Sequence, residues 1–262
     1  MVVDASCCGP EDEDERFRLD VELLGTALPP MPKPNYQQMR SEAMGGISLV
    51  ACLISTFGIL TFAFSSGCNP ETRWGLGVTI VTLAVTAISC HAYILYGDPG
   101  VVRRSQDNCL PLPPDVSEKL SGYNPRDVDP SGSHPLDGMT NIKDSDRSYC
   151  VRCCLWRDDN EMPPKVRLVR AAAARMPRSG ARVKFHHCSC CQRCVRHFDH
   201  HCGVLGRCIA GTALSGNMPC FVILILCSYG GFICTGAAGV LGMLQSNANL
   251  IAGGGGGSNA TL

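Results

Sequence analysis

The chain has 262 residues and a formal net charge of zero, from 23 basic and 23 acidic residues. The charge is segregated: 18 of the 23 basic residues lie between Arg103 and Arg207, and the 55 residues after Arg207 carry no charge. Such segregation argues against an ordinary soluble domain. With a balanced composition, no nucleic-acid partner is expected either.

The 18 cysteines predict either a disulfide framework or metal and thiol chemistry in a reducing compartment. The start of the chain has acidic residues from Asp4 onward and no early apolar core, unlike a signal peptide. Reduced cysteines facing the cytosol are therefore favoured. Residues 1–42, with an acidic cluster at 11–15 and a Pro-rich stretch at 29–34, are expected to form a disordered cytosolic tail.

Three uncharged, apolar segments predict an α-helical multi-pass membrane protein, since a spanning helix needs about 20 apolar residues. The first two spans are expected at about 44–66 and 76–96, within a transmembrane hairpin at 43–100, and the third at 218–244. Residues 245–262 are expected to be a flexible tail. Because basic residues accumulate on the cytosolic side, the loop between spans 2 and 3 is predicted to be cytosolic.

That loop divides into a polar linker at 101–148 and a Cys/His-rich domain at 149–217. Tetrahedral zinc takes four thiolate or imidazole ligands, and a Cys-x2-Cys turn supplies two of them. Cys150 and Cys153 form one such pair; Cys188 with Cys191, or Cys191 with Cys194, forms another, so the register stays open. Further ligands can come from His187, His201 and Cys208. Two structural zinc ions and a zinc-stabilised cytosolic domain are predicted.

The sequence Asp199-His200-His201-Cys202 offers a thiol, a base and an orienting acceptor within four residues. Spacing alone leaves two readings of Cys202 open, a nucleophile or one more thiol of a metal site. The basic residues Arg193, Arg196 and Arg207 could pair with phosphates of a ligand or form a solvated positive surface.

The run from His187 to Cys208 resembles the cysteine-rich domain of the DHHC protein S-acyltransferases, or palmitoyltransferases. The resemblance rests on the pattern HC-x2-C-x2-C-x4-DHHC-x5-C, and Cys150-x2-Cys153 lies upstream of it. Asp98-Pro99-Gly100 resembles the DPG motif of the family, and Asn217-x3-Phe221 resembles its N-x3-F motif.

The resemblance implies a ligand set for each zinc ion: Cys150, Cys153, His187 and Cys194 for one, and Cys188, Cys191, His201 and Cys208 for the other. It implies that Cys202 is acylated by palmitoyl-CoA or another long-chain acyl-CoA, with His200 as its base and Asp199 orienting the base. Substrates would be proteins with membrane-proximal cytosolic cysteines. The protein would be integral to the lipid bilayer of the endomembrane system (Golgi or endoplasmic reticulum) or the plasma membrane.

Three features depart from the family pattern. Gly203-Val204 follow the DHHC run in place of Pro-Trp, and an insertion at about 155–185 separates Cys153 from His187. The family usually has four spans, and three are predicted here, so one wall of an acyl cavity would be missing. The alternative function is therefore a catalytically impaired, zinc-stabilised membrane scaffold or partner subunit; the sequence does not identify an accessory subunit.

Overall fold

The computed structural model describes residues 28–121, 123, 135–144, 147–158, 184–212 and 215–254. The chain divides into two compact units: residues 1–36 with 100–199, and residues 37–99 with 200–262. The boundary between Asp199 and His200 falls inside the DHHC run.

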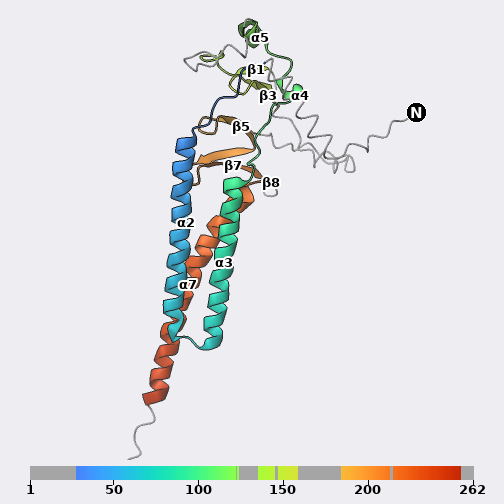
Figure 1. Ribbon diagram of the computed structural model, residues 1–262. Helices are drawn as coiled ribbons and strands as arrows, with labels where there is room; N and C mark the ends of the chain where they lie inside the picture. Colours follow the sequence, from blue (N-terminus) through green and yellow to red (C-terminus); the bar gives the residue numbers. More distant parts are fainter. Residues whose placement is uncertain are drawn as a thin grey trace, which may run out of the picture. The chain divides into compact units, whose positions relative to one another are not determined.

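Three long helices run side by side in the second unit: α2 (Tyr36–Phe64), α3 (Pro70–Tyr96) and α7 (Met218–Gly254) (Figure 1). All three are long and apolar enough to cross a membrane. The predicted fold class, with three apolar helices and a Cys/His-rich segment between the second and third, is confirmed.

The helices pack through small residues and one buried polar contact. A Cβ atom on Gly231 or Gly242 of α7 would collide with Phe57 or with the Phe64 carbonyl oxygen of α2, so glycine permits the close approach. Between these two points the hydroxyls of Thr61 and Thr235 lie 3.0 Å apart and are buried. A cluster of apolar side chains from α3, from α7 and from the segment that precedes α7 forms the core of this unit: Ala87, Cys90, Ile94, Leu205, Ile209, Leu224 and Cys227.

Local signals explain the bounds of α3. The side chain of Asn69 caps the helix by accepting a hydrogen bond from the Thr72 N–H at 2.9 Å, and Pro70 occupies the first turn, where its missing N–H costs nothing. A short 3-10 helix, η1 (Ser65–Gly67), joins it to α2. The helix ends at Tyr96, just before Asp98-Pro99-Gly100, since Pro99 disfavours continuation.

The structure extends two helices beyond the predicted spans. The prediction of disorder over residues 1–42 is wrong for the described part, because α2 begins at Tyr36 and Leu28 is buried in an apolar cluster. The flexible tail predicted from residue 245 is wrong up to Gly254, since α7 continues that far. The sequence 245–252 contains no helix breaker and the glycine run begins only at Gly253. Residues 1–27 and 255–262 lie outside the described residues.

The first unit is made of short elements. Two short helices, α4 (Gln106–Cys109) and α5 (Pro114–Leu120), precede a three-stranded antiparallel sheet of β1 (Ile142–Asp144), β2 (Arg147–Cys150) and β3 (Leu155–Asp158). Residues 101–148 are thus more than a linker. A second antiparallel pair is formed by β4 (Phe185–Cys188) and β5 (Arg193–Arg196). The predicted insertion includes β3, and its residues 159–183 lie outside the described part.

The third set of strands follows directly. It comprises β6 (Phe198–Cys202), β7 (Arg207–Thr212) and β8 (Ser215–Gly216), in that order in one sheet. The buried Asn217 fastens β7 to the start of α7: its side-chain oxygen accepts the Ala210 N–H at 2.9 Å, and its amide donates to the Cys208 carbonyl at 2.8 Å. Asn217, the polar residue of the N-x3-F motif, therefore has a structural role.

The turn between β6 and β7 depends on glycine, which yields a first prediction. Gly206 has φ of +62°, and a Cβ atom there would lie 2.3 Å from the Met39 carbonyl oxygen of α2. Gly206→Ala should destabilise this unit by about 1–3 kcal/mol, measured as a lower melting temperature in detergent micelles. Gly58→Ala is the matched control, because nothing lies within 4 Å of its added Cβ. An equal melting temperature for both variants would contradict the close packing of α2 on this turn.

Candidate metal centre and nucleophile

Two hairpins of the first unit share one turn geometry. In each, the first cysteine of a Cys-x2-Cys pair ends a strand, and the residue after the second cysteine has positive φ: Cys154 at 51° in the β2–β3 turn and Gln192 at 51° in the β4–β5 turn. The Cys191 N–H points to the Cys188 Sγ at 3.3 Å. The turn thus directs a backbone N–H, and the second thiol, at the first sulfur.

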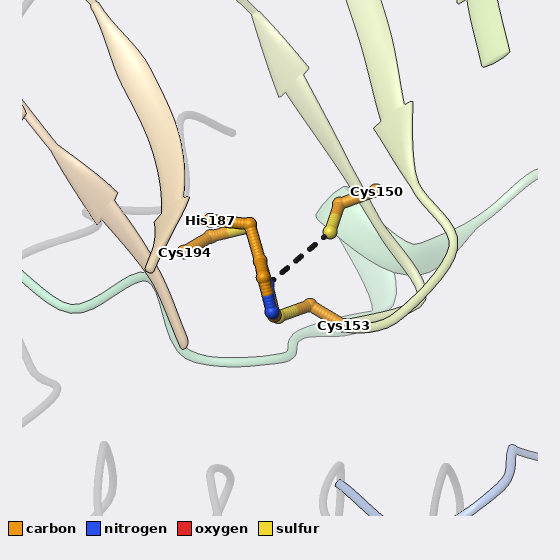
Figure 2. Close-up of side chains that lie close together, drawn as sticks. All are labelled: Cys150, Cys153, His187 and Cys194. Atoms are coloured by element: carbon orange, nitrogen blue, oxygen red, sulfur yellow. Dashed lines mark hydrogen bonds between the residues drawn. The ribbon is translucent and has the colours of Figure 1, made fainter. Parts of the chain in front are cut away.

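Four side chains converge where these two hairpins meet (Figure 2): Cys150, Cys153, His187 and Cys194. Their potential ligand atoms all lie within 4.8 Å of one another. The His187 Nδ1 is 3.6 Å from Cys150 Sγ, 3.1 Å from Cys153 Sγ and 3.9 Å from Cys194 Sγ. The structure thus brings together the four residues of the first predicted ligand set.

These distances fit tetrahedral zinc. Bonds of about 2.3 Å to sulfur and about 2.0–2.1 Å to nitrogen, at a tetrahedral angle, place ligand nitrogen and sulfur about 3.6 Å apart. The three observed separations bracket that value. The three cysteines are buried and only the histidine is partly accessible, so the donor set is shielded from water.

The neighbours of His187 select its ligating nitrogen. Its Nε2 lies 3.2 Å from the Gln192 side-chain oxygen, so an Nε2–H can donate there and leave the Nδ1 lone pair facing the cysteines. Gln192 is the positive-φ residue of the second turn. Sequence reasoning did not identify it, because its role depends on the backbone conformation that the turn imposes.

The acid–base properties of the cluster agree with shared protons between nitrogen and sulfur. Burial by itself would lower the pKa of His187, but hydrogen bonds with Cys150 and Cys153 raise it to about 10. Hydrogen bonds from Cys153 and Cys194 lower the pKa of the Cys150 thiol. A bound divalent cation would replace these protons, since zinc ligands are deprotonated.

The second predicted ligand set divides between the two units. Cys188 and Cys191 form the thiol pair of the β4–β5 turn in the first unit. His201 and Cys208 belong to the other unit, where the His201 Nδ1 lies 3.7 Å from the Cys208 Sγ. This separation also matches two ligands of one tetrahedral zinc ion.

The turn after Cys202 repeats the metal-binding turn with one change. Cys202 ends β6, as Cys150 ends β2, and the fourth residue onward, Gly206, again has positive φ. The position of the second cysteine, however, is occupied by Leu205, which is buried. Cys202 therefore has the backbone setting of a metal ligand without the second thiol of the pair.

The surroundings of Cys202 are apolar. It packs against the core cluster that includes Ile94 and Leu205, and among the described residues its thiol has no hydrogen-bond partner. Alternate residues of a strand share a face, which places His200 on the same face as Cys202 and His201 on the other. Accordingly, the rings of His200 and Phe221 contact each other edge to face, with their centroids 5.5 Å apart, and Phe221 also packs on this cluster.

The remaining predicted residues have varied surroundings. Asp199 precedes His200 on β6 and is exposed. The guanidinium of Arg193 donates to the Pro32 carbonyl at 2.7 Å, and that of Arg207 donates to the Leu95 carbonyl at the end of α3 at 2.8 Å. Both guanidinium groups thus join segments that are distant in sequence by bonding backbone carbonyl groups. Gly100 of the DPG sequence, with φ of +104°, accepts the Arg196 N–H of β5 at 2.9 Å.

Comparison with known proteins bears on this arrangement. Residues 179–250 match the family model described as DHHC palmitoyltransferase. This segment is a DHHC domain. The resemblance predicted from the Cys/His spacing is therefore confirmed, and the matched segment contains Cys202, His200 and six of the eight predicted zinc ligands.

Several curated proteins are similar over part of their length. The chain is 27% identical to "Probable protein S-acyltransferase 6" of Arabidopsis thaliana over 52% of this chain and 27% of that protein. It is 46% identical to "Probable protein S-acyltransferase 3" of the same plant over 50% of this chain and 27% of that protein. "Palmitoyltransferase Hip14" of Drosophila melanogaster is 43% identical over 19% of this chain and 8% of that protein. The chain covers less than a third of each relative.

The geometry of the first cluster generates a second prediction. Cys153→Ala should remove one bound zinc ion per chain and make the loop of the DHHC domain more sensitive to protease, because structural zinc contributes folding free energy. Cys154→Ala is the matched control: this neighbouring thiol is also buried, but it bonds to the Val151 carbonyl and not to the cluster. Zinc content is measured by mass spectrometry of the metal. Equal zinc content in the two variants would contradict the ligand set.

Proposed function

We propose that this protein is an S-acyltransferase that moves a palmitoyl-type acyl group from acyl-CoA, through a thioester on Cys202, to cysteines of other proteins. The observation that carries the proposal is that Cys202 begins a turn of the metal-binding type in which the buried Leu205 replaces the second cysteine. Cys202 has no second cysteine with which to form a metal-binding pair, and it lies at the edge of an apolar helical core. Such a thiol suits a nucleophile that carries a lipid chain. The names of the relatives also support it.

The reaction would proceed in two balanced transfers. His200 removes the proton from the Cys202 thiol, and the thiolate attacks the thioester carbonyl of acyl-CoA. The bond between the acyl group and the sulfur of coenzyme A breaks, and the coenzyme A thiolate takes the proton that His200 removed from Cys202. A substrate cysteine then repeats the exchange on the Cys202 thioester. Each step exchanges one thioester for another, so no external energy source is required. Asp199 would orient His200.

The acyl chain explains why the nucleophile belongs beside membrane helices. Burial of a chain gains about 0.8 kcal/mol per methylene group, or about 12 kcal/mol for a palmitoyl tail. The chain would therefore stay in apolar surroundings while its thioester reacts at the membrane surface. Cys202 packs on a cluster built from α3 and α7, which offers such surroundings.

Zinc would have a structural role. His187 and the three cysteines around it would hold one ion, and we propose that Cys188 and Cys191 join His201 and Cys208 around a second. Bound zinc would add rigidity to short strands by tying their cysteines and histidine together. The DHHC domain would face the cytosol from the endomembrane system or the plasma membrane, where substrate proteins with membrane-proximal cysteines are available.

The nucleophile is tested by substitution. Cys202→Ser should abolish self-labelling with a clickable palmitoyl-CoA analogue and leave zinc content unchanged, since the thiol is needed for the thioester and not for metal. Cys220→Ser is the control, because this cysteine packs on the same cluster as Cys202. Loss of a zinc equivalent in Cys202→Ser would identify Cys202 as a ligand. Undiminished labelling would exclude it as the acylated residue, and a wild-type chain without labelling would favour the scaffold function.

The base is tested separately. His200→Ala should slow self-acylation by about 10²- to 10⁴-fold, the usual contribution of a general base. Because His200 contacts Phe221 and not a thiol cluster, zinc content should stay at the wild-type value. Phe221→Leu is a useful companion, since it removes the ring contact and keeps the imidazole. A His200→Ala variant with wild-type kinetics would remove His200 from the mechanism.

A further inference from the structure

Glu42 is the last charged residue before the uncharged run of α2, and each oxygen of its carboxylate contacts another side chain. The Oε2 atom lies 3.0 Å from the Nε2 of His201. The two side chains are only 18% and 15% exposed, so this contact is partly shielded from water. A carboxylate at a membrane surface would otherwise be expected to extend into solvent.

The second oxygen of Glu42 is also occupied. Gln38, one helical turn earlier, donates its amide to the Oε1 atom at 2.8 Å. With one oxygen fixed by α2 itself, the other is held in the direction of His201. The carboxylate is therefore oriented on both sides and not merely near the ring.

The opposite nitrogen of the same ring faces a thiol, since the His201 Nδ1 lies 3.7 Å from the Cys208 Sγ. The ring thus bridges a carboxylate and a cysteine. This is the arrangement in which a carboxylate holds a metal-binding histidine: it accepts the proton of one ring nitrogen, fixes the tautomer and directs the other lone pair at the metal.

The backbone packs equally closely around this contact. A Cβ atom on Gly206 would lie 2.8 Å from the Ala43 N atom, and one on Gly46 would lie 2.4 Å from the Val204 carbonyl oxygen. An added Cβ on Gly203 would lie 3.7 Å from Glu42 itself. The first turns of α2 therefore contact both ends of the loop that follows Cys202, and Glu42 lies among these contacts.

We propose that Glu42 is a positioning residue that holds His201 in its ligating orientation and thereby fixes the strand that presents Cys202. This rests on the proposed zinc role of His201. Because neighbouring residues of β6 point to opposite faces, a fixed His201 turns Cys202 toward the apolar cluster. The first membrane helix would thus set the orientation of the nucleophile through a hydrogen bond to its neighbour.

The test compares Glu42→Ala, Glu42→Gln and Glu71→Ala in the full chain, purified with zinc. The readout is the rate at which a chromogenic chelator removes zinc. Glu42→Ala should weaken the binding of one of the two zinc ions about 10- to 100-fold, the usual loss of metal affinity when such a partner is removed, so this ion should be released faster than from wild type. Glu42→Gln keeps an oxygen that accepts the imidazole proton and should fall between Glu42→Ala and wild type. Glu71→Ala, an exposed glutamate in the first turn of α3, should match wild type.

A double variant shows whether Glu42 acts through His201. If it does, Glu42→Ala added to His201→Ala should change zinc release no further. An additional effect, or wild-type zinc release in Glu42→Ala, would overturn the inference. Should Glu42→Ala fail to fold, the Glu42→Gln variant decides: release at the wild-type rate or slower overturns the inference. Self-acylation is recorded in parallel, so that a wild type without self-acylation contradicts the proposed function while zinc release still tests Glu42.

Discussion

The strand-end turn that presents a cysteine is the constraint on which the functional part of this protein depends. In the first unit, the turn after β2 supplies Cys150 and Cys153 to the cluster around His187, and the turn after β4 presents Cys188 and Cys191. Strands of four residues bury too little apolar surface to be stable alone. Thiols that meet at one point allow a metal ion to reinforce the apolar cluster that contains Tyr149 and Leu155. The two turns in return require residues other than glycine in the left-handed region, Cys154 and Gln192.

The same turn explains how a nucleophile can arise among metal ligands. The β6–β7 turn has the strand-end cysteine and the positive-φ residue of the other two, but Leu205 stands where they have a cysteine. One substitution therefore separates a metal-binding pair from a single thiol. The buried leucine also contributes to the apolar cluster on which Cys202 packs, so the residue that withholds a second ligand also provides apolar surroundings for the sulfur.

The helices contribute more than membrane anchorage. Asn217, at the start of α7, bonds the carbonyl of Cys208 and the N–H of Ala210, and Phe221 one turn later meets His200. Residues at the start of α2 pack on the loop after Cys202. Two of the three long helices thus use their first turns to hold β6 and β7, which explains why Asn217 is fully buried at a helix end.

The sequence by itself determined the three apolar helices and the DHHC domain, because hydrophobic length and Cys/His spacing are local properties of the chain. It left open the pairing of the cysteines, since Cys191 has the same spacing to Cys188 and to Cys194. In the tertiary structure, Cys194 of the β4–β5 hairpin joins Cys150 and Cys153 of the β2–β3 hairpin, although the two hairpins are distant in sequence. Only the fold revealed the roles of Gln192, Asn217 and Leu205, whose side chains matter through backbone conformation and burial. Such effects depend on contacts between segments far apart in the chain, which no local pattern encodes.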